Sequence, residues 1–208
     1  MAEERTANVG RPRRFAPETE VNLILDAALA VMRRNGYEDI SVADILEEAG
    51  LSTRSFYRHF ESKDDLVLVM YRRNAEGAAQ RLTDRVARAG SPAEGLTAWL
   101  DEILSFGYDR RKAERMALLG SAGVRRAAGY LTEERNARHL LVAPLVGVLE
   151  AGQLAGAFPA AEPERDAHTI YAIVFEALEW ARVTEPRPTR AESLAHCHRF
   201  AVGALTGG

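Results

Sequence analysis

Cysteine is nearly absent from this 208-residue chain: Cys197 is the only one, so no intrachain disulfide can form. No apolar run approaches the roughly 18 residues that would indicate a membrane-spanning helix. The first fifteen residues also lack the apolar segment of a secretory signal. Alternating β-branched segments, which would predict strands, are missing as well. Together these absences favour a cytoplasmic, all-α protein without a membrane partner.

An excess of positive charge is missing too. The chain has 27 Lys and Arg against 30 Asp and Glu, a formal net charge of −3. Binding of nucleic acid through bulk charge is therefore excluded, and any DNA contact must come from a local patch. Basic residues do gather near the N-terminus, where they are interrupted by acidic ones such as Asp44 and Glu48. In a DNA-binding protein those carboxylates would have to face away from the phosphates.

Motifs of common enzyme classes are likewise absent, including GxSxG, the P-loop, GxGxxG, HExxH and CxxC. His196, Cys197 and His198 are consecutive residues of types that can bind a metal ion. On a helix, however, neighbouring side chains point about 100° apart, so these three would not converge on one metal ion. We therefore expect no catalytic activity, no metal and no cofactor.

What the chain does contain is helix-forming sequence throughout, rich in Ala, Leu, Glu and Arg. Ser41, Ser62, Ser91 and Thr189 are each followed three residues later by an acid, the pattern of a capping box at a helix start. We predict three parts: a flexible basic arm over 1–16, a first domain over 17–66 and a second over 67–208. The predicted helices span 17–35, 42–49, 53–59, 63–88, 92–107, 111–128, 131–153, 164–183 and 189–205.

The segment 41–63 has the pattern of a helix-turn-helix. Val42, Ile45, Leu46 and Ala49 give the first helix one apolar face, and Gly50 suits the turn because it tolerates a positive φ. The second helix begins with short polar residues backed by two phenylalanines four apart. A DNA-recognition helix needs this combination, because it must be anchored on one side and present polar groups to base edges on the other.

Side-chain chemistry suggests a role for each polar residue. Arg54 is the best candidate for bidentate contact with guanine, and Thr53 and Ser55 could reach base edges or a thymine methyl. Phosphate contacts are expected from Tyr57, His59 and Lys63, and from Ser41 at a helix N-terminus; Arg58 could contact either. The alternative is an ordinary solvated face on a helical protein.

Three segments of this region together resemble the TetR family of transcriptional regulators: ILEEAGLS at 45–52, FYRHF at 56–60 and SKDDL at 62–66. The resemblance covers roughly residues 18–66. This chain departs from the family pattern at Arg54, where a small residue or proline is more usual, and at Phe56, where leucine is usual. Arg54 could therefore be specific to this protein's operator.

The resemblance implies an all-helical homodimer, with an N-terminal three-helix DNA-binding domain and a C-terminal helical domain that binds a small molecule and dimerises. The protein would be a repressor on a palindromic DNA operator, released by an apolar or amphipathic effector. The last two helices would pair with their mates, with Ala177, Ala181 and Ala201 permitting close approach. Alternatively, their apolar stripes pack inside one subunit.

Two further sets of residues have less specific signals. Arg13 and Arg14 of the basic arm could enter a minor groove or touch phosphate, or belong to a solubilising tail. The effector pocket would be lined by a mainly apolar and aromatic set, most of which could equally be plain core: Trp99, Ile103, Phe106, Met116, Tyr130, His139, Tyr171, Phe175 and Glu176. A second possible function is a protein-interaction module on the same scaffold, although the polar face argues against it.

Overall fold

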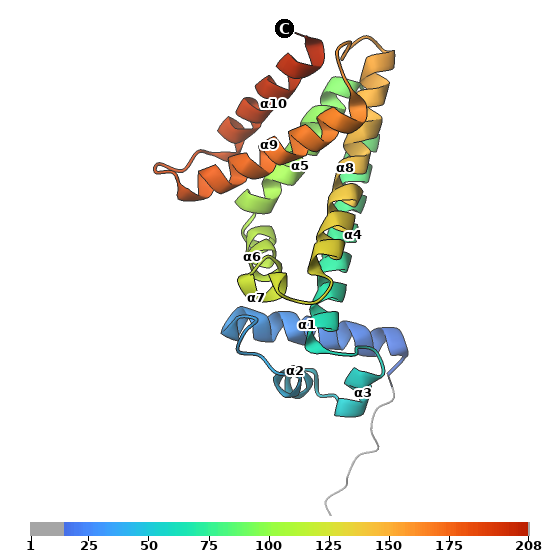
Figure 1. The fold of residues 1–208 in the computed structure, drawn as a ribbon, viewed down its shortest axis with the longest axis vertical. Helices are drawn as coiled ribbons and strands as arrows, with labels where there is room; N and C mark the ends of the chain where they lie inside the picture. The colour runs from blue at the N-terminus through green and yellow to red at the C-terminus, as the bar shows by residue number, and fades with distance from the viewer. Residues whose placement is uncertain (1–14, 208) are drawn as a thin grey trace, which may run out of the picture. The chain divides into compact units, whose positions relative to one another are not determined.

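The computed structural model describes residues 15–207, which form ten helices and no strand (Figure 1). The prediction of an all-α fold is confirmed. The chain divides after Lys63 into two compact units, which are described separately below. Within the described residues, no helix has both the length and the apolar character needed to cross a bilayer.

The N-terminal unit contains α1 (Pro17–Asn35), α2 (Val42–Ala49) and α3 (Thr53–Tyr57). Helix α1 begins at a proline, whose missing N–H costs nothing in the first turn, and ends at Gly36, whose φ of 77° favours glycine. One face of α1, including Ile24, Ala28 and Val31, is fully buried. Helix α2 packs against α1, and α3 against α2. The two predicted helices 17–35 and 42–49 have the predicted bounds.

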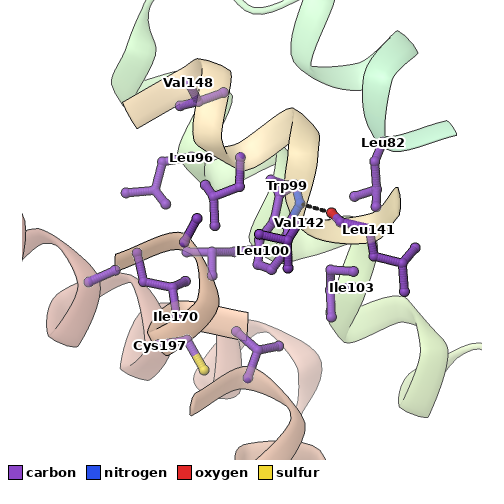
Figure 2. Packing of buried hydrophobic residues seen from close by; sticks show 14 of the residues in the cluster. Leu82, Leu96, Trp99, Leu100, Ile103, Leu141, Val142, Val148, Ile170 and Cys197 are labelled. Atoms are coloured by element: carbon purple, nitrogen blue, oxygen red, sulfur yellow. Dashed lines mark hydrogen bonds between the residues drawn. The ribbon is translucent and has the colours of Figure 1, made fainter. Parts of the chain in front are cut away.

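The larger unit is built around one central helix. Its helices are α4 (Lys63–Ala87), α5 (Pro92–Tyr108), α6 (Arg110–Leu119), α7 (Ala122–Arg125), α8 (Tyr130–Leu154), α9 (Pro163–Val183) and α10 (Arg190–Thr206). Helix α5 packs against α6, α8, α9 and α10. Leu96, Trp99, Leu100 and Ile103 on α5 are fully buried among apolar side chains of those helices (Figure 2).

Two helix predictions were wrong. The single helix expected over 111–128 is two helices, because the chain breaks at Gly120 and Ser121, where an extended serine begins α7. The recognition helix is also shorter than predicted, since α3 ends at Tyr57 rather than at residue 59. Arg58 and His59 therefore lie in the turn beyond α3, which changes where their side chains point.

The small residues expected between subunits are largely covered within one subunit. Ala181 on α9 and Ala201 on α10 are buried in the unit's own core, and Ala177 is partly buried against it. The prediction that these residues face a mate is wrong for Ala181 and Ala201. Their helices instead expose larger apolar side chains on other faces: Trp180, Val183 and Phe200 are each more than half exposed.

Candidate nucleic-acid interface

The two helices of the helix-turn-helix are fixed by local hydrogen bonds. At the start of α2 the hydroxyl of Ser41 accepts from the N–H of Asp44 at 3.2 Å, while the Asp44 carboxylate accepts from the N–H of Ser41 at 2.7 Å. This is the predicted capping box, and hydrogen bonds from Ser41 lower the pKa of the Asp44 carboxyl. Gly50, with φ of 63°, ends α2 in the left-handed conformation. The Ser52 hydroxyl then caps α3 by accepting from the N–H of Ser55.

Helix α3 has one anchored side and one exposed side. Phe56 and Phe60 are buried, with ring centroids 5.5 Å apart. Thr53, Arg54 and Tyr57 are exposed, and Tyr57 keeps 60% of its surface accessible. A five-residue helix has little stability of its own, so the caps and the phenylalanine anchors must hold this face in place.

Several residues predicted to touch DNA are engaged within the unit. Ser55 is buried, with its hydroxyl 3.2 Å from that of Ser52. Arg58 and His59 both contact Glu20 of α1, through Arg58 Nη1 at 2.9 Å and His59 Nε2 at 3.0 Å. Lys63 donates to the carbonyl oxygens of Tyr37 and Ile40, and its Nζ lies 4.5 Å from the Tyr37 ring centroid.

The structure thus separates the predicted DNA contacts into groups. Thr53, Arg54 and Tyr57 lie together on the exposed side of α3, whereas Ser55, His59 and Lys63 are directed into the unit. Both polar groups of Ser41 are used by Asp44. Arg13 and Arg14 lie outside the described residues. Glu48, one of the acidic residues that must avoid DNA phosphates, is paired with Arg34 at 2.6 Å.

Glu20 was missed by sequence reasoning. It lies 38 and 39 positions before its two partners, and nothing in a single sequence indicates such a pair. The only available signal was an acid in the first turn of a helix, which the helix dipole explains equally well.

The predicted effector residues fall into three environments in the C-terminal unit. Trp99 and Ile103 are completely buried, and the Trp99 indole N–H donates to the carbonyl oxygen of Leu141 at 2.9 Å, as the dashed line in Figure 2 shows. Phe106 belongs to the buried core cluster and Tyr130 is buried outside it, whereas Met116, Tyr171 and Phe175 lie partly buried at the margin of the core. His139 and Glu176 are exposed. Ligand binding by any of these nine residues stays a prediction.

Three tyrosines from different helices lie near one another at this margin. The rings of Tyr71 on α4 and Tyr130 on α8 have centroids 5.4 Å apart. Burial, then the neighbouring Tyr130, raises the pKa of Tyr71, and burial raises the pKa of Tyr171 to about 12. Tyr171 on α9 stacks on Phe175 at 4.4 Å, and the Arg138 guanidinium lies 5.7 Å from its ring. The phenols of Tyr71 and Tyr171 therefore stay protonated at neutral pH and can donate hydrogen bonds.

A concavity in this unit has none of the predicted effector residues in its lining. A surface groove of about 410 Å³ is lined by residues of α4, α5 and α10, among them Arg85, Thr97, Ala98, Asp101, Leu194 and His198. Close by on α10, Cys197 is buried while His196 is exposed and rests against Phe200.

Comparison with known proteins matches the helix-turn-helix segment to a family model. Residues 24–70 match the model for bacterial regulatory proteins of the tetR family. The uncharacterized HTH-type transcriptional regulator YezE of Bacillus subtilis is 27% identical over 114 residues, which are 55% of this chain and 57% of that protein. The chain thus spans little more than half the length of such curated relatives, and less in others.

Solved structures extend the likeness of fold to nearly the whole chain. The fatty acid degradation regulator FadR of Bacillus halodurans superposes with a TM-score of 0.72 at 17% identity, covering 93% of this chain and 98% of its own. FadR of Bacillus subtilis in complex with stearoyl-CoA gives a TM-score of 0.68 at 17% identity, covering 90% and 98%. The family match falls on the segment that contains the capped helix-turn-helix, and over residues 24–70 this chain is similar to the bacterial regulatory proteins of the tetR family.

Proposed function

We propose that this protein is a sequence-specific DNA-binding transcriptional regulator. The observation that carries the proposal is the exposed face of α3, from which Thr53, Arg54 and Tyr57 project. Caps and buried phenylalanine rings hold this helix in place. Arg54 is the only one of the three able to contact guanine O6 and N7 together, so we assign it base recognition. Tyr57 would contact phosphate. Arg13 and Arg14 remain proposed contacts of the arm.

We further propose that the protein binds a palindromic operator as a homodimer. The exposed Trp180 and Val183 on α9 and Phe200 on α10 support this, since they offer large apolar side chains for a second subunit to cover. A two-fold dimer presents two recognition helices and therefore requires two inverted half-sites, about 34–36 Å apart or a multiple of this. Work on DNA would place the protein in the cytoplasm, and the proposal includes no catalysis.

The decisive experiment is selection of bound sequences from a random duplex pool with the purified protein at near-physiological salt. Enrichment of an inverted repeat is the expected result. If the protein is folded and dimeric but enriches nothing, even after small-molecule ligands are added, DNA recognition is refuted. A protein-interaction module on the same scaffold would then be the better account.

For the effector we propose an amphipathic molecule with an apolar chain. Binding of this effector would release the protein from its operator, so the protein would act as a repressor until the effector binds. Two observations support it: a protein of the same fold binds stearoyl-CoA, and protonated tyrosines with an adjacent arginine lie at the margin of an apolar core. Stearoyl-CoA is a direct probe. It should raise the melting temperature and release the selected operator, with Tyr171→Phe weakening both effects.

A further inference from the structure

Glu20 is an unusual residue for its position. It lies in the first turn of α1, where acids are normally solvated, yet only 4% of its surface is exposed. One carboxylate oxygen, Oε2, contacts both Arg58 Nη1 at 2.9 Å and His59 Nε2 at 3.0 Å. A buried carboxylate is tolerated only when it is paired and hydrogen-bonded, so these two contacts are a condition for the burial.

The partners of Glu20 are the first two residues after the recognition helix. Helix α3 ends at Tyr57, and the N–H groups of His59 and Phe60 both donate to the Phe56 carbonyl oxygen. Glu20 therefore ties the end of a five-residue helix to the first turn of a nineteen-residue helix. It also places a negative charge against Arg58, whose side chain keeps 49% exposure.

We propose that Glu20 is a positioning residue for DNA specificity, which withholds the Arg58 and His59 side chains from the phosphate backbone. The inference rests on the proposed DNA binding. A cation that reaches phosphate adds affinity for every sequence, whereas a base contact adds affinity for one. By holding Arg58 and His59, Glu20 keeps non-specific affinity low, so the exposed residues of α3 dominate discrimination.

This role has a signature that a purely structural residue would lack. Neutralising Glu20 should raise affinity for unrelated DNA while lowering the ratio of operator to non-operator affinity. Each cation that newly reaches a phosphate steepens the slope of log K against log salt by about 0.9. A variant that merely loosens the fold would weaken binding to both duplexes and leave that slope unchanged or shallower.

The experiment compares the full-length parent with Glu20→Gln on the selected operator and on a scrambled duplex of equal length, over a series of salt concentrations. Glu18→Gln is the matched control, because it removes the same charge from an exposed position in the same helical turn. We expect Glu20→Gln to steepen the slope on the scrambled duplex by about 0.9, because the freed Arg58 guanidinium then reaches a phosphate. Glu18→Gln should behave as the parent does.

Arg58→Gln provides an independent test that does not depend on how well Glu20→Gln folds. If Glu20 withholds Arg58, removing the arginine from the parent leaves the salt slope unchanged. A slope shallower by about 0.9 would show that Arg58 already contacts phosphate, and would overturn the proposal. A second check adds Glu20→Gln to Arg58→Gln and His59→Gln together, where its effect on the slope should vanish.

The outcomes separate the two proposals. If the parent discriminates its operator and Glu20→Gln, folded by circular dichroism, matches the parent on both duplexes, the role of Glu20 fails and DNA recognition stands. If the parent binds neither duplex at low salt, the proposed function fails and takes the role of Glu20 with it.

Discussion

The two units both contain a buried carboxylate paired with basic side chains, but they use it differently. In the N-terminal unit Glu20 contacts two consecutive residues that follow a five-residue helix. In the C-terminal unit Glu102 on α5 accepts from Arg81 and Arg85 of α4 and from Lys112 of α6. The first therefore fixes a short segment beside the exposed recognition face, and the second joins three helices around a core.

This difference reflects what holds each unit together. In the N-terminal unit, α2 and α3 are short helices whose ends depend on caps, a turn glycine and the Glu20 contacts, since little of α3 is buried. The C-terminal unit buries a continuous apolar cluster that includes all of one face of α5. We therefore expect single substitutions to affect stability most in the C-terminal unit and binding most in the N-terminal unit.

The largest loss of stability is expected from substitution of Trp99, and the exposed Trp180 is its control. Trp99→Ala leaves a large cavity in the core and removes the hydrogen bond to the Leu141 carbonyl oxygen, and should lower the free energy of unfolding by about 3–5 kcal/mol. Trp180→Ala, more than half exposed, should change the unfolding of the isolated subunit by less than about 0.5 kcal/mol. Urea denaturation measures both. Equal losses would mean that Trp99 is not the centre of the C-terminal core.

A second prediction concerns the buried carboxylate of the C-terminal unit. Glu102→Gln leaves Arg81 and Lys112 without their carboxylate and Arg85 with Asp101 alone. It should cost about 2 kcal/mol at pH 7, less than for a fully buried pair because the three cations keep 29–47% exposure. The control is Glu179→Gln, which breaks a surface pair with Arg182 and should cost under about 0.5 kcal/mol.

The same carboxylate predicts a dependence on pH. Burial disfavours the Glu102 charge, but hydrogen bonds from Lys112, Arg81 and Arg85 outweigh it and lower the pKa of the carboxyl. A group whose pKa is lower in the folded state stabilises above its unfolded pKa, near 4.3, and that stability is lost as pH falls through the folded pKa. Glu102→Gln should remove this part of the acid destabilisation. An unchanged profile between pH 5 and 2 would contradict it.

Binding should show the opposite pattern, with Arg54 as the sensitive position. Arg54→Ala should cost roughly 1–3 kcal/mol of operator affinity and relax one base position, while the unfolding midpoint stays near that of the parent because the side chain is exposed. Arg165→Ala, an exposed arginine in the C-terminal unit, is the control. A selection repeated with Arg54→Ala that returns the same motif with equal sharpness would exclude base recognition by Arg54.

The features that could be predicted from the sequence are those set by interactions between residues close together in the chain. Helix bounds came close wherever a cap or glycine marks them locally, as at Ser41, Gly50 and Thr189, because these signals act within four residues. The expected helix 111–128 failed because its period continues through Gly120 and Ser121, and only the observed backbone shows the break.

In the candidate DNA interface, too, only features set by nearby residues could be predicted. Local pattern identified Arg54 and Tyr57 on an exposed face, since a helix places residues three apart on one side. It could not show that His59 and Lys63 turn inward, because their partners lie on α1 and in the loop before α2. Polar residues near DNA-binding positions can serve packing within the unit, and only a structure separates the two uses.

The smallest expected effect compares one device across the two units. Ser41 and Thr189 begin α2 and α10 with the same reciprocal capping box. Ser41→Ala and Thr189→Ala each remove one hydroxyl cap, so each should lower the free energy of unfolding by about 1 kcal/mol. Similar losses would show that a cap has the same value in a small unit as in a large one. A much larger loss for Ser41→Ala would mean that the N-terminal unit depends on α2 more than on its core.

The same pair decides whether Ser41 touches DNA. Because Asp44 already accepts from both the N–H and the hydroxyl of Ser41, a phosphate at this helix start would have to approach a carboxylate. We therefore expect the operator affinity of Ser41→Ala, measured with fully folded protein, to stay within about twofold of that of Thr189→Ala, less than the loss of one phosphate hydrogen bond would cause. A tenfold weaker affinity for Ser41→Ala alone would restore Ser41 as a phosphate contact and require the Asp44 carboxylate to move away on binding.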